Sequence, residues 1–123
     1  MEGEDGMFDV IGRRIVLSPG DTGVVSFVPE DMQVGEGDRA VFTVSGRGGR
    51  LRLEKVAAPE GNVFHVPFLS GDTDSWRAGE YLWDIRVVRS AVVDEDGRVT
   101  DGAEVITPFP PSPLVIAKAV GRV

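Results

Sequence analysis

Histidine is the side chain most often used to move protons near neutral pH, and this chain has a single one, His65. A Ser-His-Asp arrangement would have to use it, with the imidazole between a hydroxyl and a carboxylate. His65 lies within the segment VFHVPF, where it alternates with Phe64, Val66 and Phe68. Successive side chains of a strand point to opposite faces, so we expect His65 on the face opposite the apolar residues. The pattern favours a surface strand histidine over a catalytic one.

Carboxylates form two groups that could do chemistry: Asp72 with Asp74, and Asp94 with Glu95 and Asp96. Such groups serve glycoside hydrolysis or hold calcium. Both lie in sequence typical of turns, where acids accept hydrogen bonds from backbone amides. An EF-hand loop needs an oxygen ligand at the position of Arg98. We therefore predict turn-forming residues, with no metal and no cofactor.

One basic segment, SGRGGRLRLEK at residues 45–55, combines glycine with arginine as phosphate loops do. A dinucleotide fingerprint needs glycine at the position of Leu51, and the Gly-Lys-Ser or Gly-Lys-Thr of a P-loop is absent. Binding of single-stranded nucleic acid uses aromatic side chains, and this segment has none. We therefore predict a hairpin loop and a strand whose Leu51 and Leu53 face the core, while its arginines guard an edge.

Length and charge limit the classes of protein and partner. The chain has 123 residues, so we expect one domain over 1–123, in which 1–9 form a loose acidic N-terminus. Its 13 Lys and Arg against 20 Asp and Glu give a net charge of −7. Nucleic acid and anionic membranes require clustered positive charge, so we expect neither as a partner.

The sequence contains no cysteine and no pattern of a secretory signal or membrane span. Cysteine is absent, so disulfides and thiolate metal sites cannot form. The segment MEGEDGMFDV at 1–10 is acidic where a secretory signal is basic and then apolar, and no run reaches the ~18 apolar residues of a membrane span. We expect a protein without a signal peptide, in the cytoplasm or in a virion.

Sixteen glycines and eight prolines divide the chain into short segments in which apolar and polar residues alternate. The strands expected from this alternation cover residues 13–17, 22–28, 39–45, 49–56, 62–69, 79–93, 98–106 and 114–120. Residues 94–97 form a hairpin turn between two of these strands, and 114–120 taken alone could be a short helix. About eight or nine short strands predict an all-β protein, which we interpret as an immunoglobulin-like antiparallel β-sandwich.

The segment RAGEYLW contains the elements of a tyrosine corner, in which a tyrosine hydroxyl bonds back to the backbone a few residues upstream. Gly79 would allow the bend and Tyr81 would provide the hydroxyl. Trp83 stands where antibody domains have a cysteine, and its side chain would bury on the order of 200 Å². The alternative is an ordinary strand that begins Tyr-x-Trp. Both interpretations are structural.

The triplet Gly-Asp-Thr occurs twice, at residues 20–22 and 71–73. Aspartate in a turn accepts a backbone amide beside a glycine with positive φ, so each copy predicts a turn. An internal repeat is the alternative explanation. The residues that follow the two copies, GVVSFV and DSWRAG, do not match, and we therefore favour two independent turns.

Three short motifs follow one another along the chain: Gly-Asp-Thr before a first strand, then GD-x-x-x-F-x-V, then Gly-x-Tyr-x-aromatic-Asp-Ile. Their residues are Gly20, Asp21, Thr22, Gly37, Asp38, Phe42, Val44, Gly79, Tyr81, Trp83, Asp84 and Ile85. This order resembles small structural proteins of tailed phages and prophages, in particular the N-terminal domain of the siphophage baseplate upper protein. The hairpin at 90–105 and the PFPPSP segment at 108–113 depart from the pattern of that family.

The resemblance implies assembly through protein contacts, without catalysis, in a virion or in the bacterial cytoplasm during assembly. We expect a structural or adaptor protein whose partners are other tail or baseplate proteins, or further copies of itself. The alternative is a carbohydrate- or ligand-binding sandwich that would use an exposed Trp76 with Asp72 and Asp74 beside it. A tryptophan packed beneath the corner would instead be structural.

Two apolar segments could form an interface, the hairpin at 87–99 and the C-terminal segment at 108–120. The candidate contact residues are Ala91, Val92, Val93, Phe109 and Leu114. Contiguous exposed apolar surface usually marks an interaction site, so we expect a homo-oligomer, or a monomer that becomes ordered only in the tail. The alternative is that both segments pack against their own sandwich.

Overall fold

The computed structural model describes residues 9–11, 13–108 and 110–117. Its strands are β1 (Asp9–Ile11), β2 (Arg14–Leu17), β3 (Gly23–Phe27), β4 (Arg39–Ser45), β5 (Leu51–Ala57), β6 (Pro59–Glu60), β7 (Val63–Phe68), β8 (Gly79–Arg89), β9 (Val92–Val93), β10 (Val99–Asp101), β11 (Glu104–Ile106) and β12 (Ser112–Ile116). Its two helical turns are η1 (Arg47–Gly49) and α1 (Ser70–Thr73). The predicted all-β fold is confirmed.

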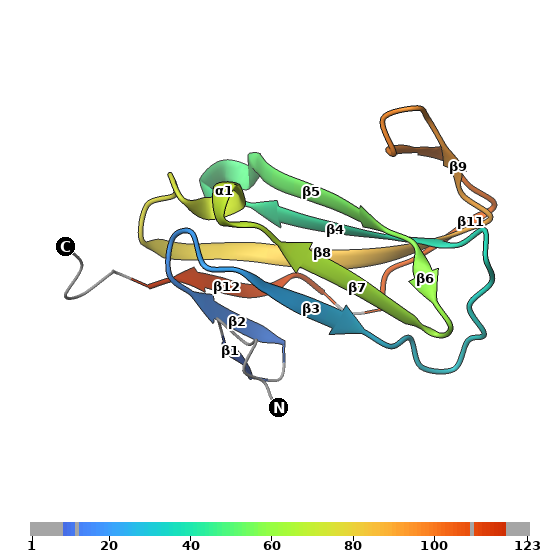
Figure 1. The fold of residues 1–123 in the computed structure, drawn as a ribbon, viewed down its shortest axis with the longest axis horizontal. Helices are drawn as coiled ribbons and strands as arrows, with labels where there is room; N and C mark the ends of the chain where they lie inside the picture. Colours follow the sequence, from blue (N-terminus) through green and yellow to red (C-terminus); the bar gives the residue numbers. More distant parts are fainter. Residues whose placement is uncertain (1–8, 12, 109, 118–123) are drawn as a thin grey trace.

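Two facing sheets form a sandwich (Figure 1). The larger sheet has the order β1-β2-β12-β8-β4-β5, with β11 also paired to β8, and the smaller sheet has the order β3-β7-β6. Neighbouring strands are antiparallel, except that β2 and β12 are parallel. A separate ribbon of β9 and β10 projects from the sandwich at the upper right of Figure 1.

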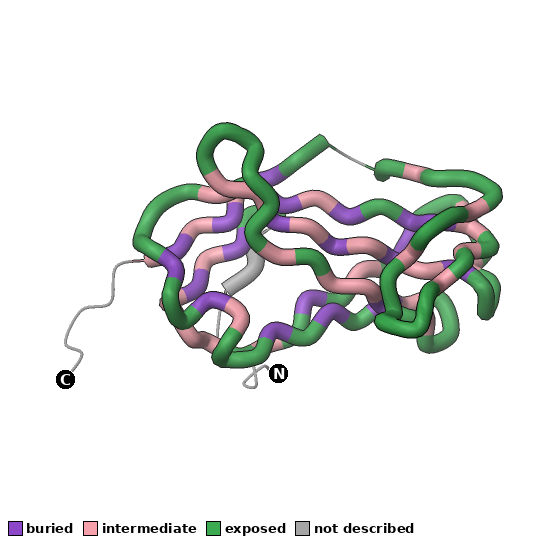
Figure 2. Tube along the Cα trace, turned by 90° about the horizontal axis from the view of Figure 1, so that it is seen from above, coloured by how far each residue is buried: buried purple, intermediate pink, exposed green. Residues whose placement is uncertain are grey.

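The alternation that predicted the strands reappears as alternating burial along them (Figure 2). Ala40, Phe42 and Val44 of β4 are buried, whereas the residues between them are only partly covered. In β7 the buried residues are Phe64 and Val66, together with the last residue of the strand. Because each strand packs one face against the opposite sheet, a period of two in the sequence becomes a period of two in burial.

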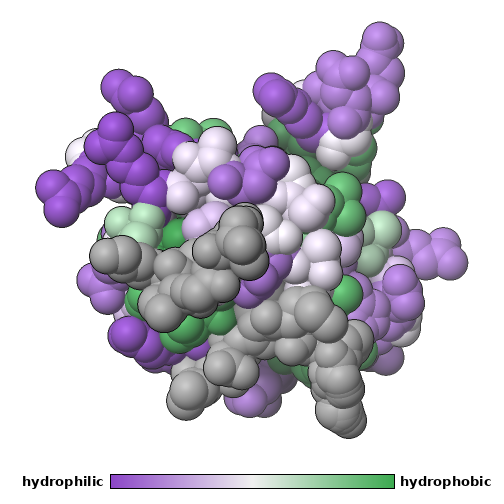
Figure 3. Space-filling model, turned by 60° about the vertical axis from the view of Figure 1, so that its left-hand side comes forward, coloured by the Kyte–Doolittle hydropathy of each residue, from purple (hydrophilic) through white to green (hydrophobic). Residues whose placement is uncertain are grey.

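Phe42 lies at the centre of the core. Its ring stacks on Trp83 of β8, with centroids 5.2 Å apart and 22° between the planes. It also meets Phe68 of the smaller sheet edge-on, at 5.6 Å and 82°. The contact with Phe68 joins the two sheets through apolar area, and each fully buried side chain of this size stabilises the fold by about 1.5–3 kcal/mol. On the face shown in Figure 3 the surface is mainly hydrophilic, with hydrophobic side chains visible only in small areas.

The structure corrects the boundaries of the long hairpin. The strand expected over 79–93 ends at Arg89, because Ser90 has a φ of +50° and leaves the extended conformation. The return strand expected over 98–106 is divided into β10 and β11 at Gly102. A Cβ atom at Gly102 would lie 2.3 Å from Val88 Cγ1, so the chain passes β8 too closely for any side chain there.

Other boundaries also differ from the prediction. Asp9 begins β1, so the loose N-terminus expected over 1–9 includes one residue of a strand, while 1–8 lie outside the described residues. Leu51 was expected to face the core but is 57% exposed, because it starts the edge strand β5 where the smaller sheet does not cover it. The C-terminal segment forms β12, a strand that begins at Ser112, two residues before the expected start.

Candidate functional site

The predicted corner is present at the start of β8. Tyr81 Oη donates a hydrogen bond of 2.9 Å to the carbonyl of Arg77, four residues upstream. Gly79 has a φ of +150°, which side-chain-bearing residues rarely adopt. Trp83 is 5% exposed, and its Nε1 donates to the carbonyl of Arg13 at 2.8 Å. The corner therefore joins β8 to the preceding loop and, through Trp83, to the residue before β2.

Trp76 fills the space next to the corner. It is 7% exposed, and its ring lies 5.0 Å from the Tyr81 ring at an angle of 31°. The guanidinium carbon of Arg52 lies 5.5 Å from the centroid of the Trp76 ring, within cation–π range. A buried tryptophan offers no platform to a sugar ring. The carbohydrate-binding alternative required an exposed Trp76, and Trp76 is instead packed at the corner as part of the core.

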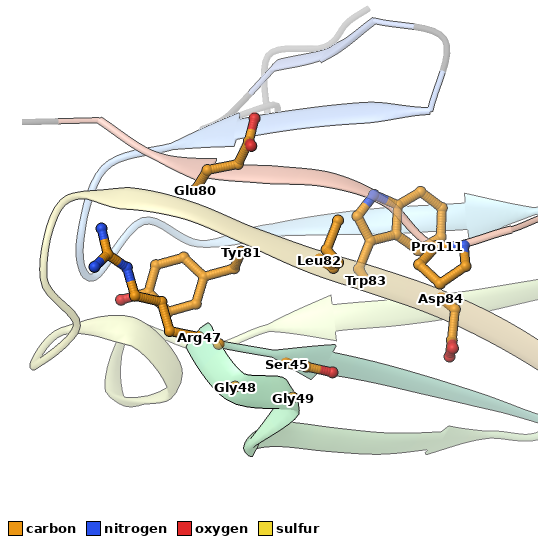
Figure 4. A pocket seen from close by; sticks show the side chains of 11 residues that line it. Ser45, Arg47, Gly48, Gly49, Glu80, Tyr81, Leu82, Trp83, Asp84 and Pro111 are labelled. Carbon is orange, nitrogen blue, oxygen red and sulfur yellow. The ribbon is translucent and has the colours of Figure 1, made fainter.

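Two adjoining hollows border the corner, and we call them together the corner groove. One has a volume of about 400 Å³ and is lined by residues 45–49, residues 80–84 and Pro111 (Figure 4). The other has a volume of about 540 Å³ and is lined by Gly46, Arg47, Arg50, Arg52 and residues 77–81. Both hollows include Tyr81, so the corner forms the wall that they share.

His65 is on the exposed face of β7, as its alternation predicted. Ser26, its register partner on β3, has its hydroxyl 2.8 Å from His65 Nδ1, and the carboxylate of Glu60 is 3.9 Å from Nε2. A hydrolytic triad has the reverse arrangement, with the serine at Nε2 and the acid bonded to Nδ1. The distance to Glu60 is also too long for a hydrogen bond, and both side chains are substantially exposed, 41% for His65 and 76% for Glu60.

The two Gly-Asp-Thr copies form turns, as predicted, and they also contact each other. The backbone N–H of Gly20 donates to the hydroxyl of Thr73 at 3.0 Å, and Thr73 is fully buried. Asp21 closes its own turn by accepting the N–H of Ser18 at 2.8 Å. Sequence reasoning treated the copies separately, because nothing local to either copy indicates that they meet in space.

The acids of the second copy are engaged in local structure. Asp72 accepts the backbone N–H of Leu69 at 2.7 Å and forms an ion pair with Lys55 Nζ at 2.7 Å. Asp74 is exposed just after α1. The ion pair joins α1 to β5, so Asp72 has a structural role in addition to forming its turn.

The acidic hairpin turn is organised by one of its three carboxylates. Asp94 Oδ1 accepts the backbone N–H groups of Asp96 and Arg98, both at 2.9 Å, and Gly97 has a φ of +83°. This is the turn chemistry expected for the segment. Glu95 is exposed, and the described residues contain no cluster of three His, Asp or Glu suited to a metal ion.

The candidate interface residues occupy different environments. Val92 is 55% exposed on the projecting ribbon, with Ala91 and Val93 half-buried on either side of it. Leu114 is fully buried between β2 and β8, so its assignment to an interface was wrong: strand β12 lies inside the larger sheet. Phe109 lies outside the described residues.

Sequence reasoning missed the structural role of Asp38, which is 4% exposed at the start of β4. Its carboxylate accepts the N–H groups of Gly35 at 2.8 Å and Ser90 at 3.0 Å, and it forms an ion pair with Arg89 Nε at 2.9 Å that lacks the alignment of a hydrogen bond. Burial opposes ionisation, but the two N–H groups and the guanidinium outweigh it and hold the pKa of Asp38 below its ordinary value. The only signal in the sequence was a Gly-Asp pair before a strand.

Comparisons with known proteins found no match to this chain among family models, curated proteins or solved structures. Among the described residues, no helix is long and apolar enough to cross a membrane.

Proposed function

We propose that this protein is a non-catalytic structural or adaptor component of a phage or prophage tail or baseplate, which acts through protein–protein contacts. The observation that carries the proposal is the ribbon of β9 and β10, which projects from the sandwich (Figure 1) with Val92 55% exposed. Val105 on the neighbouring β11 is 58% exposed. Exposed apolar side chains on a projecting element suit a protein contact better than a free surface.

The strand order supports an immunoglobulin-like interpretation of the sandwich. In chain order, strands β3, β4, β5, β6, β7, β8 and β12 correspond to B, C, C′, D, E, F and G of a variable-type domain. The pairings β3-β7-β6 and β12-β8-β4-β5 match the two sheets of that fold. Tyr81 takes the place of the corner tyrosine of strand F, and Trp83 takes the place of the cysteine two residues later.

This interpretation places the projecting ribbon in the F–G connection. In variable domains that connection is one of the loops that bind a partner, and the connections at an end of a sandwich are carried by a rigid sheet. The backbone N–H of Ala91 donates to the carbonyl of Gly37 at 2.8 Å, which fixes the base of the ribbon to the preceding loop. The ribbon can therefore present Val92 from a fixed base.

Light scattering coupled to size-exclusion chromatography, over a range of protein concentrations, tests the proposal. We expect the parent protein to self-associate. Val92→Asp should shift it to the monomer, because a carboxylate buried in a contact without a counter-charge is costly. Val24→Asp is the matched control, since Val24 is 50% exposed on β3 rather than on the ribbon. A strictly monomeric parent, or equal effects of the two substitutions, would contradict a contact between copies of this chain at Val92.

A further inference from the structure

Four arginines border the corner groove: three come from the basic segment at 45–55, and the fourth comes from the loop before β8. Arg47 lies in η1 and Arg50 just after it, Arg52 lies on β5, and Arg77 precedes β8. All four residues are exposed, and none of them forms an ion pair with another described residue. In a chain with 13 Lys and Arg and a net charge of −7, this is a local concentration of uncompensated positive charge.

The segments that carry these arginines are fixed by backbone hydrogen bonds and by one ring contact. A tight turn across 46–50, closed by a 2.8 Å backbone hydrogen bond between its end residues, carries two of the arginines. Tyr81 holds the carbonyl of Arg77 at 2.9 Å. Arg52 lies over the ring of Trp76 at 5.5 Å. The exposed guanidinium groups that extend from this fixed backbone keep their N–H donors available for an anionic ligand.

One acid, Glu80, lines the same hollow as the four arginines. Glu80 and Tyr81 are neighbours on β8, so their side chains leave opposite faces of the strand. Figure 4 shows Arg47 beside Tyr81 and Glu80 on the other side of the β8 ribbon. The Glu80 carboxylate therefore does not neutralise the positive charge on the arginine side of the groove.

The hollow lined by residues 80–84 and Pro111 adds an apolar surface to this positive charge. Leu82 is 48% exposed there, beside Trp83 and Pro111, on the same face of β8 as Glu80, and Arg47 lines this hollow as well as the other one. A free inorganic anion would use only the arginines. A long polyanion would extend beyond the Debye length of ~8 Å and past the arginines, over a chain whose net charge is −7. A short peptide with carboxylate and apolar side chains can use both hollows.

We propose that the corner groove binds a short acidic peptide segment of a partner protein. Its carboxylates pair with the guanidinium forks of Arg47, Arg50 and Arg77, and an apolar side chain lies against Leu82. The site rests on the proposed function, since it states the chemistry of one partner of the adaptor. The groove lies at the start of β8, whereas the ribbon of β9 and β10 follows the end of that strand.

Fluorescence anisotropy tests the proposal with a labelled peptide in which glutamate alternates with phenylalanine, and with the same peptide carrying glutamine in place of glutamate. We expect the parent to bind the acidic peptide. The double variant Arg47→Gln, Arg50→Gln should weaken binding by at least about tenfold. The matched control is Arg86→Gln, Arg98→Gln, which removes the same charge from exposed positions outside the groove. Thermal melts establish that both variants are folded.

Failure to bind the acidic peptide, equal affinity for the glutamine peptide, or equal losses in the two double variants would overturn the proposal. Stabilisation of the parent by inorganic phosphate without peptide binding would also overturn it, in favour of a small-anion site. Preferential binding of a single-stranded oligonucleotide would overturn it in favour of nucleic acid. Val92→Asp should leave peptide binding unchanged. If Val92→Asp has no effect on self-association while peptide binding is lost only in the groove variant, the ribbon contact fails and the groove stands.

Discussion

Asp38→Asn is a substitution whose effect should depend on pH in a direction set by the structure. The variant keeps the shape of the side chain but replaces one carboxylate oxygen with an amide group that donates. Asp38 accepts two backbone N–H groups, from Gly35 and Ser90, so one of these donors would then face another donor. Arg89 would also lose its counter-charge, 2.9 Å away. The substitution therefore disturbs the connection between the start of β4 and the end of β8.

The magnitude follows from these three contacts. Hydrogen bonds to charged groups contribute about 1.5–3 kcal/mol each, and a buried donor without a partner costs about 1–3 kcal/mol. Asparagine retains one acceptor, and the Arg89 side chain is 33% exposed, so water partly replaces the lost ion pair. We expect Asp38→Asn to lower the free energy of unfolding at pH 7 by about 2–4 kcal/mol.

The pH dependence distinguishes the loss of the charge from a simple packing defect. The pKa of Asp38 is lowered in the folded protein, so its ionised form stabilises the native state above the unfolded pKa of about 4. That contribution is lost as the pH falls through the folded pKa. The difference in stability between parent and variant should therefore be full at pH 6–7 and should narrow below about pH 4.

Urea unfolding at a series of pH values measures this difference, and equal m-values show that the two unfolding transitions are comparable. Asp96→Asn is the matched control, because Asp96 is exposed in the hairpin turn, and it should change stability by less than about 0.5 kcal/mol. A variant as stable as the parent at pH 7 would refute the role assigned to the carboxylate. A stability difference that stays constant down to pH 2 would refute the electrostatic explanation.

Two further predictions concern packing and the corner. Tyr81→Phe should cost about 0.5–1.5 kcal/mol in denaturant melts, because the carbonyl of Arg77 loses its donor at an exposed position where water can replace it. Trp83→Ala should cost more, about 3–5 kcal/mol, through a cavity beside Phe42, and an order of effects opposite to this would contradict the assignment of Trp83 to the core. Gly102→Ala should lower the melting temperature, because the new methyl group would clash with β8. Gly71→Ala is the control and should leave the melting temperature unchanged, because no atom lies within 4 Å of its new methyl group. Equal melting temperatures of the two variants would show that the chain can move away from β8 at no cost.

The strands and their buried faces could be predicted because alternation is a local property of the chain. Phe42 and Val44 in one segment, and Phe64 and Val66 in another, show a period of two that only a half-buried strand satisfies. The corner was predictable for a similar reason, since the hydroxyl of Tyr81 and its acceptor are four residues apart. Turn acids such as Asp94 bond to amides within their own segment.

Tertiary structure decided which of these surfaces are covered, because covering depends on segments that are distant in sequence. Leu51 and Leu114 are both apolar residues in predicted strands, yet the first lies exposed on an edge and the second is buried between neighbouring strands. Trp76 is in the core, where Arg52 of β5, a residue distant in sequence, lies over its ring.

Contacts made across the fold account for the remaining features. The parallel pairing of β2 with β12 joins segments about 100 residues apart, and the ion pair of Asp38 with Arg89 joins residues about 50 apart. The corner groove is of the same kind, since folding brings Arg77 next to the basic segment at 45–55. Local sequence therefore determines the strands and turns of this protein. The long-range packing of those strands determines where charged and apolar surface meet, because only folding brings segments that are distant in sequence together.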